Sequence, residues 1–329
     1  MPVKEKIVEI GANVFRRAWT QPTIGHGIKK ARKLERAGGG AILNILGEHH
    51  DQEADVLRDE KKYRDLVDAI ADAKVTARIS IKPTQFGYDL GKSEYASVRT
   101  DYLVKTRDRM WSIVDYATRK GIKVEIDMEH SGTHDFTFET FRGFCRKLTQ
   151  SGRGGMLGLA VQANYDRSIG DVEQLAKLDE KTYGRLRLRL VKGIYTPAKG
   201  DRSAFGPEED QKTLANYRKL IDISAEAKNI DISVGTHRND ILQYALGKHV
   251  PIEEQALAGI RYPFKVGLRR QGISVWDYVP IGSGKAAGAY ASRRATKAMQ
   301  LGWRTFTDFM RPAIWKGTWL PSEHQKKKK

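Results

Sequence analysis

The stretch KVEIDME, residues 123–129, combines the two signals that decide the fold. Its short β-rich apolar core is typical of a strand, and the run ends in carboxylates that do not suit a protein interior. A helical pattern, KTRDRMWSIVDYATRKG (105–121), comes directly before it and ends at Gly121, a residue typical of helix ends. One face of that helix would hold Met110, Ile113, Val114 and Ala117. Alternation of helix and strand favours a parallel sheet.

Seven further runs of this kind are spaced along the chain, with helical stretches between them. They are AILNILGE (41–48), ARISIKPTQ (77–85), LGLAVQAN (157–164), RLRLVKGIY (187–195), IDISVGTH (230–237), EEQALAGI (253–260) and ISVWDYVPIG (273–282). The helical stretch 52–74 places four apolar residues on one face, namely Tyr63, Leu66, Val67 and Ile70. Eight units over about 250 residues predict a closed (β/α)8 TIM-type barrel in a single domain. We expect residues 1–300 to form this barrel with an N-terminal helical segment.

Most of the runs end in polar side chains at the carboxyl side. These are Glu48, Lys82, Gln85, Asp127, Glu129, Gln162, Arg189, Lys192, Thr236, His237, Gln255 and Tyr278. Any one of them is explained by a solvated strand end. Barrel enzymes build their active sites at the rim formed by the carboxyl ends of the strands. Polar residues at the same end of so many strands therefore predict a functional site at this rim.

The composition restricts the compartment and the partners. Lys and Arg exceed Asp and Glu by 58 to 40, so the net charge is +18, which favours an anionic partner or a well-solvated basic surface. The single cysteine, Cys145, excludes an intramolecular disulfide, indicates a reducing compartment and is expected to be inert core. No membrane-spanning apolar run and no signal-peptide pattern are present, so we expect a cytoplasmic protein.

Two patterns suggest nucleotide or nucleic-acid binding, and both fit poorly. IGSGKAAG (281–288) looks like a phosphate loop, but Val279 and Ala286 stand where a Walker A loop needs Gly and Ser or Thr. The remaining chain is too short for the βαβ unit that a dinucleotide fingerprint requires. Basic residues are spread along the whole chain without a recognisable nucleic-acid module, so nucleic acid is not an expected partner.

A metal site is a second candidate, because histidines and carboxylates cluster in residues 48–51 and 127–135. Neither cluster has an HxH pair or another familiar ligand spacing, so we expect loop histidines and no metal. A metal-dependent barrel hydrolase or isomerase remains the alternative function.

A basic helical face follows the last strand. In AYASRRATK (289–297), Tyr290, Arg293, Arg294 and Lys297 fall at i, i+3, i+4 and i+7. A solvated surface would explain such a face, but two neighbouring guanidinium groups can also hold a small carboxylate through charge-assisted, fork-like bonds.

In their order and spacing, these motifs resemble the catalytic barrel of the proline dehydrogenase family from about residue 26 to 300. RLVKGIY nearly repeats the family's RLVKGAY, IDMEH resembles its DMED, EEQALAG its EFQxLxG, and YASRR matches its YxxRR helix. The resemblance implies that the eighth helix lies over the barrel mouth. It also implies FAD-dependent oxidation of L-proline to 1-pyrroline-5-carboxylate by hydride transfer to flavin N5, with electrons passed to a quinone.

The family's site residues carry over where this sequence agrees. Asp127 and Arg189 would be the catalytic residues, beside the substrate ring and the flavin. The substrate would be bound by Lys82, Tyr195, Leu257, Tyr278, Tyr290, Arg293 and Arg294, with the two arginines and Lys82 on its carboxylate. The FAD contacts would be Met128, Gln162, Lys192, Gly193, Ile194, Thr236 and His237.

The sequence departs from the family pattern at several of these motifs. Lys297 stands where the family commonly has Glu, so like charges repel beside the two arginines. Pro83 replaces a leucine, which indicates a strand end or a bulge. Three other departures are Asn164, Arg238 and Ala258. Tyr278 is retained, which in the family goes with proline rather than hydroxyproline. A barrel of this family that has lost catalysis and binds an anion is a third interpretation.

The C-terminal extension, residues 301–329, alternates aromatic and basic residues and ends in QKKKK. Tryptophan with basic residues is typical of a membrane interface, and also of a helix that packs on the barrel. We expect a peripheral contact with an anionic membrane surface, on the inner face of the cell membrane, which would bring the enzyme to quinone.

Overall fold

Eight parallel strands form a closed barrel in the computed structural model, which describes residues 20–90, 96–193, 207–259, 262–284 and 287–288. The strands are β1 (Gly40–Ile45), β2 (Ala77–Ile81), β3 (Val124–Ile126), β4 (Leu157–Gln162), β5 (Leu186–Val191), β6 (Ile230–Gly235), β7 (Ile252–Leu257) and β8 (Ser274–Ile281). The ring closes where β1 pairs with β8, with Gly40 opposite Trp276 and Ile45 opposite Ile281. The prediction of a TIM-type barrel is confirmed.

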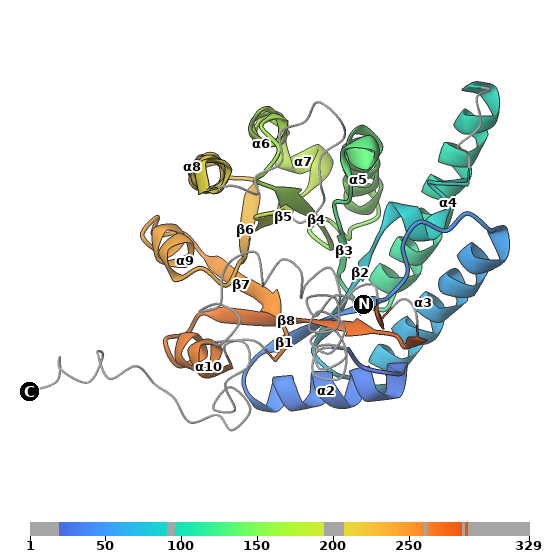
Figure 1. Ribbon diagram of the computed structural model, residues 1–329, viewed down its shortest axis with the longest axis horizontal. Coiled ribbons are helices and arrows are strands. Elements are labelled where there is room, and N and C mark those ends of the chain that lie inside the picture. The colour runs from blue at the N-terminus through green and yellow to red at the C-terminus, as the bar shows by residue number, and fades with distance from the viewer. Residues whose placement is uncertain (1–19, 91–95, 194–206, 260–261, 285–286, 289–329) are drawn as a thin grey trace, which may run out of the picture.

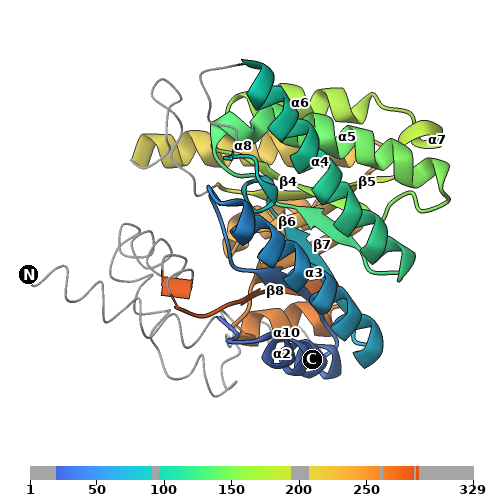
Figure 2. The ribbon, with the colours of Figure 1, turned by 90° about the vertical axis from the view of Figure 1, so that its right-hand side faces the viewer.

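Helices surround the barrel in chain order (Figure 1). They are α2 (Ile24–Arg36), α3 (Glu53–Ala73), α4 (Ala96–Arg119), α5 (His134–Gln150), α6 (Arg167–Ala176), α7 (Glu180–Tyr183), α8 (Pro207–Glu226), α9 (Asn239–Leu246) and α10 (Tyr262–Arg270). Figure 2 shows α3, α4 and α5 side by side along one flank, where neighbouring helices contact each other. The helix predicted over 289–297 and the extension 301–329 lie outside the described residues.

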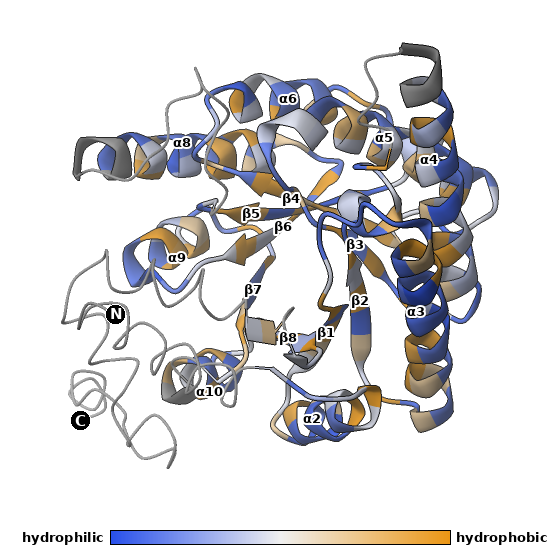
Figure 3. Cartoon of the chain, turned by 45° about the vertical axis from the view of Figure 1, so that its right-hand side comes forward, coloured by the Kyte–Doolittle hydropathy of each residue, from blue (hydrophilic) through white to orange (hydrophobic). Residues whose placement is uncertain are grey.

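The core lies between the strands and the inner faces of the helices. All four predicted residues of α3 and all four of α4 are buried in it, which confirms both helical faces. Polar residues cover the outer sides of helices such as α3, while hydrophobic residues gather on the strands (Figure 3). Cys145 is buried in the same core, and burial raises the pKa of its thiol, so it is unreactive as expected.

The strands end earlier than the strand-like runs that were identified in the sequence. The run 77–85 is a strand only to Ile81, because Pro83 cannot donate to the ladder and instead opens a 3-10 helix, η1 (Pro83–Phe86). The expected strand end at Pro83 is therefore confirmed. Lys82 and Asp127 each follow the last residue of a strand, so the polar residues of these runs belong to the loops at the rim.

No helix among the described residues is long and apolar enough to cross a bilayer.

Candidate active site

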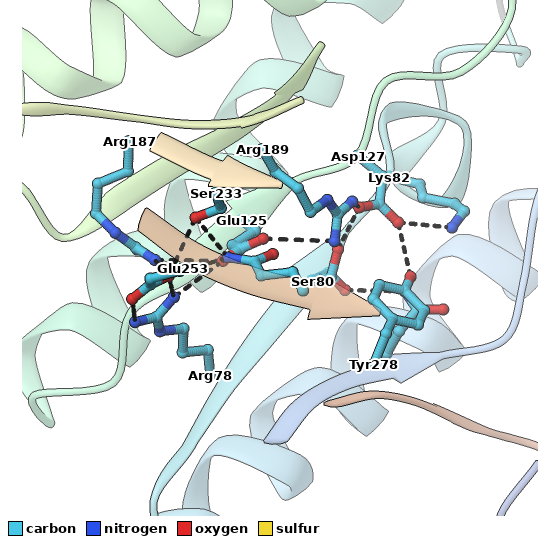
Figure 4. A network of polar contacts seen from close by, with 12 residues as sticks. Arg78, Ser80, Lys82, Glu125, Asp127, Arg187, Arg189, Ser233, Glu253 and Tyr278 are labelled. Atoms are coloured by element: carbon cyan, nitrogen blue, oxygen red, sulfur yellow. Dashed lines mark hydrogen bonds and ion pairs between the residues drawn. The ribbon is translucent and has the colours of Figure 1, made fainter. Parts of the chain in front are cut away.

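Four side chains converge on the carboxylate of Asp127 at the carboxyl end of the barrel (Figure 4). Lys82 Nζ lies 2.9 Å from Asp127 Oδ2, and the Tyr278 hydroxyl donates to the same oxygen at 2.7 Å. Ser80 Oγ donates to Oδ1 at 2.6 Å, and Arg189 donates to that oxygen as well. We call these five residues the mouth cluster. Side chains from β2, β5 and β8, and from Lys82 just after β2, therefore meet at the one carboxylate that follows β3.

The charges of the mouth cluster keep Asp127 ionised. Burial by itself would raise the pKa of Asp127, but the cations Lys82 and Arg189 and the bonds from Ser80 and Tyr278 hold that pKa well below its usual range. Burial likewise would lower the pKa of Arg189, and Asp127 raises it instead. Asp127 is thus a permanent carboxylate at neutral pH, suited to orienting cations and not to accepting a proton.

A second polar group lies deeper in the barrel and supports Arg189 from below. We call it the inner network; its members are Arg78, Glu125, Arg187, Ser233, Glu253 and Gln255. Arg189 Nη1 lies 3.4 Å from Glu125 Oε2, which joins the two groups, as Figure 4 shows. Barrel interiors are usually filled by branched apolar residues, so this charged layer is a specific feature of the chain. Its position below Arg189 indicates that it holds that guanidinium in place.

Glu253 gives the inner network a pH dependence. Arg78 binds Glu253 in a bidentate manner at 2.7 and 2.8 Å. Burial would raise the pKa of Glu253, but Arg78 and Arg187 outweigh it and lower that pKa to about 2. The folded protein therefore keeps this carboxylate ionised after the unfolded chain has taken up its proton.

We predict that Glu253→Gln lowers the free energy of unfolding by about 3 kcal/mol at neutral pH. Because the folded pKa is depressed, this contribution is complete above the ordinary value of 4.5 and is lost as pH falls toward about 2. Urea unfolding at several pH values between 7 and about 3 measures it. Glu139→Gln is the control, since the Glu139 side chain is 70% exposed. A difference between Glu253→Gln and the parent that stays constant with pH would contradict the prediction.

Period-two alternation explains which residues face inward. On β2 and just beyond it, Arg78, Ser80 and Lys82 share one face, and on β3 Glu125 shares a face with Asp127. Sequence analysis identified Lys82 and Asp127 as strand-end residues but missed Ser80 and Glu125. Counting back by two from each predicted residue would have found both.

The predicted cofactor residues follow neighbouring strands. Gln162 is buried at the end of β4 and donates to the Glu129 carbonyl at 2.7 Å. Met128 is buried beside Asp127. Lys192 and Gly193 follow β5, and Thr236 with His237 follows β6, where both are half-buried. These positions form an arc along the rim from β3 to β6.

Gly193 occupies a position that only glycine tolerates. Its φ is +97°, and a Cβ there would come within 2.0 Å of the Asn164 side chain. The Asn164 amide thus packs directly against the backbone at the end of β5, in the space that a side chain at position 193 would need.

Two residues predicted for the rim lie elsewhere. Gln85 packs between the barrel and α3. It donates to the Ile45 carbonyl at the end of β1 at 2.8 Å and accepts from the hydroxyl of Tyr63 on α3. Gln255 lies within β7 and belongs to the inner network, 3.1 Å from Glu125 Oε1. The rim prediction was wrong for both, because Gln85 turns outward in η1 and Gln255 bonds to Glu125 and Ser233 in the layer below Asp127.

The remaining predicted substrate residues divide between the described and undescribed parts of the chain. Leu257 ends β7 and packs against Leu46 and Ala287, beside the mouth. The other predicted residues, Ile194, Tyr195, Tyr290, Arg293 and Arg294, lie outside the described residues, as does Lys297.

Glu129 is a buried acid that the sequence placed at the rim without a role. Its carboxylate accepts from the Thr84 backbone at 2.9 Å and from the Thr84 hydroxyl at 2.7 Å. Burial raises the pKa of Glu129 to about 7, despite the nearby charge of Lys82. The mouth therefore holds one carboxylate that is always charged and one that titrates near neutrality.

Known proteins resemble this chain over most of its length. Residues 27–297 match the family described as "Proline dehydrogenase". The chain is 30% identical over 296 residues to proline dehydrogenase of Deinococcus radiodurans, covering 86% of this chain and 85% of that protein. It is 26% identical over 268 residues to proline dehydrogenase 1 of Bacillus subtilis, covering 79% and 80%.

A solved structure shares the fold. Proline utilization A from Bdellovibrio bacteriovorus superposes with a TM-score of 0.74 at 21% identity, over 85% of this chain and 32% of that one. With the family match over most of its length, the chain belongs to the proline dehydrogenase family.

Proposed function

We propose that this protein oxidises L-proline to 1-pyrroline-5-carboxylate, with FAD as the bound electron acceptor. The observation that carries the proposal is the mouth cluster, in which Lys82, Arg189 and Tyr278 are fixed around Asp127 at the catalytic end of a barrel of this family. Proline offers a carboxylate and an apolar ring, and the cluster offers cations and an aromatic ring.

The chain's own residues fit a flavin. Arg189 is a buried cation and Gln162 a buried amide on the same arc of strand ends. FAD would be held by Met128, Gln162, Lys192, Gly193, Thr236 and His237, together with Ile194. When bound, FAD supplies the hydride acceptor that no side chain provides.

The mouth cluster would orient the substrate. Asp127 stays ionised and holds Lys82 and Arg189 at fixed positions, so Lys82 needs little reorganisation when the substrate carboxylate arrives, and Arg189 little when the flavin binds. The Arg189 guanidinium lies 5.3 Å from the centre of the Tyr278 ring, and the Tyr278 hydroxyl is held by Asp127. A ring fixed at its hydroxyl end can form a wall for the pyrrolidine, with Leu257 as a second wall.

The test of the proposal is optical. The purified protein should show visible flavin absorption that L-proline bleaches in the absence of oxygen. A colourless protein that takes up no added FAD would contradict the proposal, and metal analysis would then test the alternative of a metal-dependent hydrolase or isomerase. Flavin that L-proline does not bleach would favour the inactive barrel.

We predict that Arg293→Ala and Arg294→Ala each raise the KM for proline by about 10- to 100-fold while FAD stays bound. Each guanidinium would contribute charge-assisted bonds to the substrate carboxylate, worth roughly 1.5–3 kcal/mol. Steady-state kinetics and the flavin-to-protein absorbance ratio measure the two effects. Arg36→Ala is the control, since it removes an exposed guanidinium from the last turn of α2. Unchanged proline kinetics in both arginine variants would remove the arginines from the site.

We further propose that the electrons pass to a quinone and that residues 301–329 contact an anionic membrane surface where the quinone resides. The alternating aromatic and basic residues of this extension support the proposal.

A further inference from the structure

Three loops at the barrel mouth bring two histidines and a carboxylate together. His49 follows β1, Asp89 follows η1 after β2, and His130 follows β3. Each offers one ligand atom, and these atoms all lie within 4.8 Å of one another. We propose that His49, Asp89 and His130 form a binding site for a divalent transition-metal ion of the Zn²⁺ type.

The geometry is close to that of an occupied site. Zinc bonds to imidazole nitrogen and carboxylate oxygen are about 2.0–2.2 Å long, so neighbouring ligand atoms in a tetrahedral site lie roughly 3.3–3.5 Å apart. His49 Nδ1 and Asp89 Oδ2 are 2.7 Å apart, a direct hydrogen bond that must open slightly. The rings of His49 and His130 lie with centres 5.5 Å apart and 22° between their planes, and their ligand atoms are within 4.8 Å of each other.

The ligand set selects the class of ion. Two imidazoles and one carboxylate suit zinc and similar ions, whereas Mg²⁺ and Ca²⁺ prefer an all-oxygen shell. Glu48 precedes His49 in the chain, so its carboxylate and that of Asp89 place negative charge beside the site. This local charge favours a cation in a chain whose net charge is +18.

The site also has a fixed side and an open side. The Asp89 side chain is 2% exposed and therefore held in place, whereas that of His49 is 47% exposed. His49 lines a cavity of about 520 Å³ that also contacts residues 22–24 and 281–283. An ion can enter from this cavity, and a water molecule can complete its coordination, as in zinc sites with three protein ligands.

Occupancy would tie the loops after β1, β2 and β3 together next to the mouth cluster. His49 is adjacent to Glu48, which lies 3.8 Å from Lys82 Nζ, and His130 is adjacent to Glu129. The ion would therefore stabilise the rim that carries Lys82 and Asp127. The sequence could not show this site, because its three ligands come from three separate loops and each histidine cluster supplies only one of them.

The experiment is a zinc titration of the flavin-loaded, tag-free protein after chelator treatment, in competition with a chromophoric chelator. We expect one equivalent of Zn²⁺ to bind, and His49→Ala and His130→Ala each to weaken this binding more than about tenfold. His26→Ala is the matched control, since His26 is an exposed histidine that bonds to Thr23 and is not one of the three ligands, and the affinity of this variant should equal that of the parent. Mg²⁺ should not compete.

Thermal unfolding gives a second readout that does not depend on catalysis. Saturating Zn²⁺ should raise the Tm of the parent and of His26→Ala, and leave the Tm of His49→Ala and His130→Ala unchanged. Asp89→Asn keeps the hydrogen bond to His49, so it tests the ligand role in a variant expected to fold, and it should also weaken binding. A parent that takes no Zn²⁺ from the chelator, or His49→Ala and His130→Ala affinities equal to that of His26→Ala, would overturn the proposal.

Discussion

Replacing Asp127 by asparagine is expected to lower kcat/KM for proline oxidation by about 10²-fold. Asp127 is the shared acceptor for Lys82, Arg189 and Tyr278, at 2.9 Å for the lysine and 2.7 Å for the tyrosine. An amide of the same shape can accept only at its oxygen, so the partners of the other oxygen must move. Displacement of substrate-orienting groups by about 1 Å is enough for a loss of this size.

The same substitution should destabilise the protein. Lys82 is 6% exposed and Arg189 is 8% exposed, so both cations would stay buried without their counter-charge. Loss of one partner from a buried ion pair costs about 3–5 kcal/mol. Glu125 still contacts Arg189 at 3.4 Å, which favours the lower end of that range.

Three measurements separate these effects, namely steady-state kinetics, the flavin-to-protein ratio and urea unfolding. Asp231→Asn is the matched control, because Asp231 pairs with Arg185 at 2.7 Å but both side chains are nearly half exposed. That control should cost less than about 1 kcal/mol and leave kinetics unchanged. Wild-type kinetics in a folded, flavin-loaded Asp127→Asn protein would remove Asp127 from the active site.

The largest loss of stability without a direct catalytic role is expected for Asp277→Asn. Asp277 on β8 is 1% exposed and accepts from Lys265 at 2.6 Å and from Arg269 at 2.6 Å. Both cations come from α10, so this carboxylate attaches the helix to the barrel. Its neutralisation leaves two buried cations side by side and should lower the free energy of unfolding by about 3–5 kcal/mol.

That loss is a large part of the total stability of a typical domain, about 5–15 kcal/mol. Urea unfolding followed by far-UV circular dichroism measures it. Asp65→Asn is the control, since Asp65 pairs with Lys61 on an exposed face of α3, with side chains 49% and 76% exposed. We expect that control to change stability by less than about 0.5 kcal/mol. Equal effects of the two substitutions would show that the buried triad contributes no more than a surface pair.

The Lys265→Met variant separates charge imbalance from lost packing. It removes one cation and leaves Asp277 paired with Arg269 at 2.6 Å, so it should cost less than Asp277→Asn. Lys265 also donates to the Leu257 carbonyl at 2.8 Å, at the end of β7. A loss greater than that of Asp277→Asn would indicate that this carbonyl contact dominates.

The polar strand ends allowed part of the active site to be predicted. Lys82, Asp127, Arg189 and Tyr278 were identified from the sequence, and the structure brings all four together. Ser80 and Glu125 were missed because a serine or glutamate inside a strand run looks like ordinary alternation. Gln255 was misplaced because strand boundaries, and the depth in the barrel that each strand residue reaches, are poorly defined by the sequence.

By itself the sequence determined the architecture of this protein. Strand and helix periodicity are local properties, written in the spacing of apolar residues, and eight alternating units leave few ways to bury their faces except a closed barrel. Only the tertiary structure decided which charges meet. The register of the strands sets Arg78 against Glu253 and Arg189 against Asp127, and the loops after β1 and β2 bring His49 to Asp89. The two residues of each pair are far apart along the chain. Such pairing depends on distances across the barrel, which no local pattern encodes.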